Sequence, residues 1–127
     1  MKSLLFTLLF ALMMGSAAAA QTPFTAEKFQ QAQAEDKVIL IDIYAEWCPT
    51  CRRQSKIINE YFAANPDSSI QLLTVDFDSQ KDWVTHFKAP RQSTLLVYKG
   101  VEQIHFSVAE TSKKRIFKTL SDAEQAN

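Results

Sequence analysis

Apolar residues occur along this chain in short runs that alternate with segments of helical spacing. Residues 38–45 are almost wholly apolar and rich in Ile and Val, which predicts a strand buried on both faces. Similar runs predict strands over residues 70–77, 94–98 and 103–108. The last two flank Lys99-Gly100, a tight turn, and therefore form a hairpin.

The segments between the strands predict helices. Thr25 caps a first helix that runs to about residue 36, and a second helix covers residues 51–64. Residues 78–87 form a short helix or turn, and Thr111 opens a last helix. The order is thus α-β-α-β-α-β-β-α. Since strands separated by helices pair in parallel and the hairpin adds an antiparallel edge, we expect an α/β fold with a four-stranded mixed sheet flanked by helices.

The first twenty residues are typical of a secretory signal. Lys2 supplies a positive charge, residues 4–14 are almost wholly apolar, and residues 17–20 are four alanines that suit signal peptidase. The apolar run is too short to span a membrane, so we expect residues 1–20 to be cleaved and no stable membrane insertion to remain. Residues 21–127 then form one domain, which is periplasmic or secreted.

Composition gives no support to two classes of function. The 14 basic and 14 acidic residues balance, so charge gives no reason to expect nucleic acid or an anionic membrane as a partner. Gly100 is the only glycine after residue 20, which excludes a glycine-rich phosphate-binding loop.

The chain has two cysteines, Cys48 and Cys51, in a Cys-x-x-Cys pair between the strand at 38–45 and the helix that follows. At such a turn the helix N-terminal N–H groups stabilise a thiolate. A disulfide that spans two residues constrains almost no unfolded-chain entropy, so a role as a structural staple is disfavoured. The pair therefore points to redox chemistry between a dithiol and a disulfide.

Asp42 lies in the middle of the apolar strand. Burial of a carboxylate raises its pKa, which makes Asp42 a candidate proton acceptor or donor. The alternative is a structural carboxylate at the rim of the strand or paired to a lysine.

Three segments together resemble the thioredoxin-fold family, in the same order along almost the whole of residues 21–127. They are residues 41–51, with the Trp-Cys-Pro-Thr-Cys motif, residues 75–78 and residues 94–100. The resemblance implies a thiol–disulfide oxidoreductase that needs no cofactor and acts on protein thiols and disulfides. It also implies that Trp47 shields and positions the site.

The sulfur chemistry predicts the order of events. Cys48, which we expect to be the more exposed, attacks a partner disulfide, and the deeper Cys51 resolves the mixed disulfide. By the resemblance, Asp42 shuttles a proton for Cys51, and Thr74 stands where many thioredoxins have a lysine. The same pair oxidises a dithiol in reverse, so the sequence leaves the direction open. A reducing role would require a membrane thiol relay as electron donor.

The loop before the third strand departs from the family. Ser93 occupies the position of the family's cis-proline, and a non-proline cis bond costs ~2.5–4 kcal/mol, so we predict a trans bond and a remodelled substrate groove. The residues between the cysteines also differ from the Gly-Pro of ordinary thioredoxins. The candidate substrate contacts are Trp47, Pro49, Thr50, Gln92, Ser93 and Thr94.

Two other functions stay open. Two adjacent thiolates suit a soft metal such as Cu(I). A zinc site wants four ligands, and His86 and His105, the remaining candidates, are more typical of surface or core-edge positions, so no metal site is assigned. The third alternative is a partner-binding module that uses the Ser93 loop and in which the dithiol is incidental.

Overall fold

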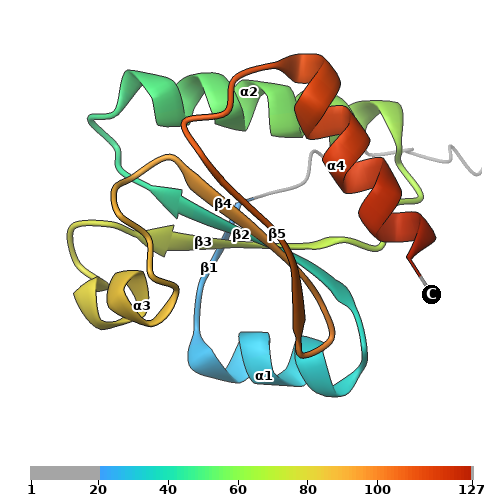
Figure 1. Ribbon diagram of the computed structural model, residues 1–127, viewed down its shortest axis with the longest axis horizontal. Coiled ribbons are helices and arrows are strands. Elements are labelled where there is room, and N and C mark those ends of the chain that lie inside the picture. Colours follow the sequence, from blue (N-terminus) through green and yellow to red (C-terminus); the bar gives the residue numbers. More distant parts are fainter. Residues whose placement is uncertain (1–20, 127) are drawn as a thin grey trace, which may run out of the picture.

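The computed structural model describes residues 21–126, so the predicted signal peptide lies outside the described residues. Within that range a mixed sheet carries two helices on each face, α2 and α4 on one and α1 and α3 on the other (Figure 1). The elements are β1 (Thr22–Pro23), α1 (Ala26–Ala34), β2 (Val38–Tyr44), α2 (Pro49–Ala64), β3 (Gln71–Asp76), α3 (Lys81–His86), β4 (Thr94–Lys99), β5 (Glu102–Val108) and α4 (Lys113–Gln125).

The strand order is β1-β3-β2-β4-β5. The first three strands of this order pair in parallel, while β4 and β5 add antiparallel pairs at one side. The predicted α/β fold is confirmed, and the hairpin lies at the sheet edge as expected. The predicted number of strands was wrong: β1, two residues that pair with β3 at Leu73 and Thr74, is a fifth strand. Two residues are too short to show any periodicity.

Helix ends differ from the prediction by one to three residues. The second helix begins at Pro49, because Cys48 rather than a later residue is its N-cap. The last helix is capped by Ser112, whose side chain accepts from the Arg115 N–H, and not by Thr111. The first helix ends at Ala34.

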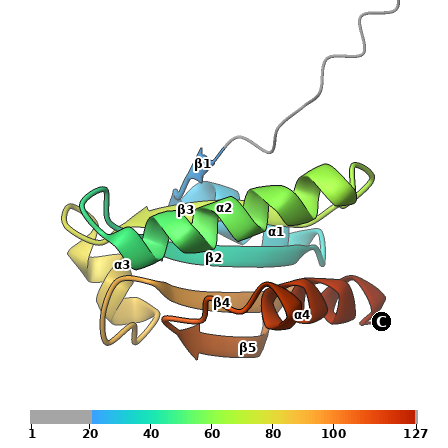
Figure 2. The ribbon, with the colours of Figure 1, turned by 90° about the horizontal axis from the view of Figure 1, so that it is seen from above.

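The central strand β2 is buried on both faces, as its continuous apolar run predicted. Seen from above, α2 and α4 lie over the same face of the sheet (Figure 2). Leu40 packs toward this face, whereas Ile39, Ile41 and Ile43 pack toward the α1 and α3 side. Since successive side chains of a strand alternate between faces, Asp42 lies on the same face as Leu40, beneath α2. The fold therefore brings a carboxylate and the cysteine-bearing helix to one layer. None of the helices in residues 21–126 has the length and apolarity needed to cross a membrane.

Candidate active site

The two cysteines lie at the turn from β2 into α2. The Cys48 N–H donates to the Ala45 carbonyl at 3.1 Å, which closes the turn. Cys48 has extended backbone angles and acts as the N-cap, with its sulfur accepting from the Cys51 N–H at 3.1 Å. Pro49 occupies the first helical turn, where a missing N–H costs no intrahelical hydrogen bond. The local sequence thus places one sulfur at the positive end of a helix.

The two sulfurs differ in acidity. Both cysteines are free thiols. Burial alone would raise the pKa of Cys48, but hydrogen bonds from the Cys51 side chain, the Ser93 side chain, the Cys51 N–H and the Gln92 side chain outweigh it and hold that pKa below its ordinary value. For Cys51, burial and its hydrogen bond to Cys48 raise the pKa. Cys48 is therefore the more acidic thiol of the pair, as the predicted order of attack requires.

Cys48 is only marginally more exposed than Cys51. Cys48 exposes 1% of its surface and Cys51 0%, so neither sulfur is open to solvent. Ser93, just before β4, lies over the pair and contacts both sulfurs, and the partly exposed Gln92 precedes it in the same loop. A partner disulfide can reach Cys48 only after part of this cover moves.

Ser93 is fully buried at the position where the resemblance placed a cis-proline. No peptide bond within residues 21–126 is cis, so the bond before Ser93 is trans, as predicted. Its φ is +64°, in the left-handed region that residues other than glycine rarely adopt. The Ser93 hydroxyl oxygen lies 3.2 Å from the Cys48 sulfur and 3.0 Å from the Cys51 sulfur. A polar group thus faces the dithiol where the family has an apolar ring.

Asp42 is 1% exposed, and neither of its carboxylate oxygens has a hydrogen-bond partner within residues 21–126. Loss of hydration raises the pKa of Asp42 to about 7. Its neighbour across the sheet on the same face is Thr74, whose hydroxyl oxygen is also buried without a partner. The structure therefore places Asp42 in the sheet interior, and not at a strand rim or beside a lysine. A carboxyl that titrates near neutral pH can exchange a proton at the working pH.

The other predicted contact residues lie around the cysteines, and their contact with a substrate stays a prediction. Trp47 is 56% exposed, and its indole N–H donates to the Asp78 carboxylate at 2.8 Å. Pro49 is exposed and Thr50 is half-buried. Thr94 is buried, and its hydroxyl donates to the Arg91 carbonyl at 2.7 Å.

Gln54 is a site residue that the sequence reasoning missed. Its side chain is fully buried, and its amide NH₂ donates to the Ser93 carbonyl at 3.1 Å and to the Glu110 carbonyl at 3.0 Å. Gln54 therefore joins the loop before β4, which lies over the cysteines, to α2 by a hydrogen bond. The signal was its spacing: Gln54 follows Cys51 by three residues and precedes Ile57 by three, so a polar residue stands on an apolar helix stripe.

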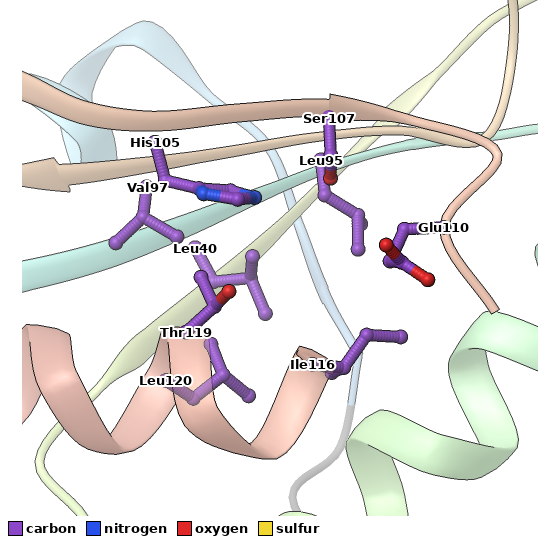
Figure 3. A pocket seen from close by; sticks show the side chains of 9 residues that line it. All are labelled: Leu40, Leu95, Val97, His105, Ser107, Glu110, Ile116, Thr119 and Leu120. Carbon is purple, nitrogen blue, oxygen red and sulfur yellow. The ribbon is translucent and has the colours of Figure 1, made fainter. Parts of the chain in front are cut away.

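The two histidines lie outside the dithiol site. His86 packs edge-on against Trp83. His105 lines a cavity between the sheet and α4, and Ser107 and Glu110 line the same cavity (Figure 3). This cavity is about 10 Å³, room for one water molecule, and neither cysteine lines it. Residues 21–126 contain no group of three or more His, Cys, Asp or Glu side chains placed to hold a metal ion.

Comparison with known proteins decides the family. The sequence model of the family described as Thioredoxin matches residues 20–122, most of the chain. The chain belongs to the thioredoxin family. Members of this family are thiol–disulfide oxidoreductases, and the Cys48–Cys51 pair fits their Cys-x-x-Cys site.

Individual relatives agree over most of their length. The chain is 27% identical to a thioredoxin of Alicyclobacillus acidocaldarius over 101 residues, which cover 80% of this chain and 95% of the relative. It is 29% identical to thioredoxin-1 of Saccharomyces cerevisiae over 80 residues, covering 63% and 76%. Among solved structures, Trxlp from Edwardsiella tarda EIB202 superposes with a TM-score of 0.75 at 34% identity, covering 80% of this chain and 98% of that one.

Proposed function

We propose that this chain exchanges thiols and disulfides with exported or envelope proteins, with Cys48 as nucleophile and Cys51 as resolving thiol. The observation that supports this division of labour is the asymmetry of hydrogen bonding. The Cys48 sulfur accepts from the Cys51 N–H at 3.1 Å, whereas burial and its contact with Cys48 keep Cys51 protonated. The thiolate is the nucleophile in disulfide exchange, so the first attack belongs to Cys48.

Two sulfur exchanges complete the reaction. The Cys48 thiolate forms a bond to one sulfur of the partner disulfide, and the other sulfur leaves with the electron pair and takes a proton. Cys51 then loses its proton and attacks the Cys48 sulfur, which releases the partner's second thiol and leaves a Cys48–Cys51 disulfide. Two electrons pass from this chain to the partner, and the reverse sequence oxidises a partner dithiol.

The resolving step needs a base that accepts the Cys51 proton, and Asp42 is the candidate for this base. It lies beneath α2, is without a hydrogen-bond partner in the described part of the chain, and has a pKa of about 7. A carboxylate of this basicity takes a proton more readily than an exposed one. The buried state of Cys48 adds a requirement, since part of the cover over its sulfur must move before the first attack.

Variants at the two cysteines test the chemistry. We expect the wild-type chain to reduce insulin when dithiothreitol is supplied, and Cys48→Ala to abolish this activity. Cys51→Ala removes only the resolving thiol, so it should accumulate mixed disulfides with partner proteins, which non-reducing gels and mass spectrometry detect. The assignment would be contradicted if the Cys48→Ala variant formed stable mixed disulfides through Cys51 while the Cys51→Ala variant formed none through Cys48.

The exported context requires a separate experiment. We expect the full chain, expressed in a Gram-negative bacterium, to appear in the periplasm or medium with Gln21 as its N-terminus. A variant that lacks residues 2–20 is the matched control and should stay in the cytoplasm. Retention of the full chain in the cytoplasm with residues 1–20 intact would refute export. Thiol trapping in the same cells then decides the direction of electron transfer. The Cys48–Cys51 pair of an oxidant is mostly a disulfide in the cell, and that of a reductant is mostly a dithiol.

A further inference from the structure

Ser93 has a relation to the two cysteines that the family assignment does not explain. Its hydroxyl oxygen lies 3.2 Å from the Cys48 sulfur and 3.0 Å from the Cys51 sulfur, and the residue is completely buried. A hydroxyl has one proton to donate and lone pairs to accept with. It can therefore donate to only one of the two sulfurs at a time.

The position of this hydroxyl is fixed by the backbone. The Ser93 N–H donates to the Ile43 carbonyl at 2.8 Å, and the Ser93 carbonyl accepts from the Ala109 N–H at 2.9 Å and from Gln54 at 3.1 Å. These bonds hold a φ of +64°, a conformation that is strained for a residue with a Cβ. Three hydrogen bonds thus maintain a strained backbone that aims one side chain at the dithiol.

We propose that Ser93 is a catalytic residue of the dithiol site, whose hydroxyl donates to whichever cysteine sulfur is negatively charged. It donates to Cys48 in the resting dithiol and turns to Cys51 in the mixed disulfide. This inference rests on the proposed exchange reaction and adds a participant to it. Hydrogen bonds to a charged acceptor are stronger than those between neutral groups, so the hydroxyl follows the charge.

The reaction balances with the hydroxyl unchanged. When Cys48 attacks, its negative charge moves to the leaving sulfur, which takes a proton from water. The Cys48 sulfur is then neutral, and the hydroxyl is free to rotate. Cys51 loses its proton to the site's base and becomes the second thiolate, which accepts the Ser93 hydrogen bond until it attacks Cys48. The partner's second sulfur leaves and is protonated from water, and Ser93 retains its own proton throughout.

Two variants separate the hydroxyl from its backbone. Ser93→Ala removes the hydroxyl and keeps the backbone strain, whereas Ser93→Gly removes both. An effect that is the same in both variants is assigned to the loss of the hydroxyl. If Ser93→Ala does not fold, the measurements on Ser93→Gly alone test the proposal. Ser121→Ala on α4 is the matched control for the loss of one serine hydroxyl. The ionisable neighbours of the site stay unchanged in all variants; they are Asp42 and Tyr44 on β2, Glu46 in the turn before α2, and Arg52 on α2.

The first measurement is the pH profile of Cys48 alkylation by iodoacetamide in a Cys51→Ala background. Because one hydrogen bond to the thiolate is lost, we expect the midpoint to rise by about one pH unit in both Ser93 variants. The control should keep the wild-type midpoint. A merely structural role would change the limiting rate at high pH and leave the midpoint in place, and that result would overturn the proposal.

The second measurement follows the resolving step with the aromatic disulfide DTNB under stopped flow. The wild-type chain should release one thiolate in a phase that depends on DTNB concentration and a second in a phase that does not. At neutral pH we expect both phases to slow about tenfold in both Ser93 variants. An unchanged second phase would refute the transfer of the hydrogen bond to Cys51. If the wild-type chain shows no second phase and no insulin reduction, the proposed function fails instead, so the two failures are distinguishable.

Discussion

Neutralising Asp42 should remove most of the pH dependence of stability between pH 5 and pH 8. The pKa of this carboxyl rises from 3.8 to about 7 on folding, because burial removes its hydration. Below pH 4 the group is protonated in both states and has no effect. As pH rises toward 7 the unfolded state ionises first, so stability falls progressively, and above pH 7 the loss is constant. At 1.36 kcal/mol per pKa unit the full loss is about 4 kcal/mol, of which about 2–3 kcal/mol falls between pH 5 and pH 8.

Urea unfolding of the fully reduced chain at several pH values measures this loss. Asp42→Asn keeps the shape of the side chain and cannot titrate, so the wild-type free energy of unfolding should fall by about 2–3 kcal/mol more than that of the variant between pH 5 and pH 8. The comparison uses the change in the free energy of unfolding with pH and not its absolute value. A buried amide without a hydrogen-bond partner destabilises the variant by an amount that does not depend on pH. Asp67→Asn, at an exposed position, controls for the loss of one negative charge. Parallel slopes for wild type and Asp42→Asn would refute the claim that Asp42 is buried as a carboxyl with a strongly raised pKa.

Three further changes test the cover of the site, a hydrogen bond between α2 and α4, and the turn between β4 and β5. Gln92→Ala should accelerate iodoacetamide alkylation of Cys48 at high pH severalfold, because it removes a partly exposed side chain beside the buried sulfur. An unchanged limiting rate of alkylation would show that other atoms close the site. Tyr61→Phe removes a 2.6 Å hydrogen bond to Glu124 and should lower the free energy of unfolding by about 1–2 kcal/mol in urea melts, with no loss of insulin reduction. Gly100→Ala should cost about 1–2 kcal/mol by the same melts, because φ is +56° and the added Cβ would lie 2.5 Å from a carboxylate oxygen.

The fold was largely predictable because its signals are local. The apolar run of residues 38–45 and the helical spacing after the cysteines are properties of neighbouring residues, and they predicted the order of elements from residue 26 onward. The strand β1 was missed because two residues show no period, and its pairing with β3 depends on chain segments fifty residues apart. The cap of α4 was displaced by one residue because Thr111 and Ser112 offer the same chemistry, and only the backbone geometry chooses between them.

The candidate site was predictable in its chemistry and not in its enclosure. The spacing of Cys48 and Cys51 predicted a reactive sulfur at a helix N-terminus, and the structure places the Cys48 sulfur there. Whether that sulfur is exposed depends on the loop before β4, which meets it only through tertiary folding. The positive φ of Ser93 and the anchoring by Gln54 are likewise set by contacts between residues 16 to 56 positions apart in the sequence. The apolar stripe of α2 marks Gln54 as unusual, but no local pattern specifies its partners or the φ of Ser93.

The replacement of the family's proline by Ser93 also bears on the direction of electron flow. A proline has no hydroxyl to donate to sulfur, whereas the Ser93 hydroxyl lies within hydrogen-bond distance of both sulfurs. The sulfurs of a disulfide are uncharged, so a hydrogen bond to a thiolate stabilises the dithiol relative to the disulfide. Each ~1.4 kcal/mol of such stabilisation raises the reduction potential of the pair by about 30 mV. Ser93 therefore makes the oxidised pair a stronger oxidant than the same pair would be without that hydroxyl. Removal of the hydroxyl in Ser93→Gly should accordingly lower the reduction potential measured against glutathione.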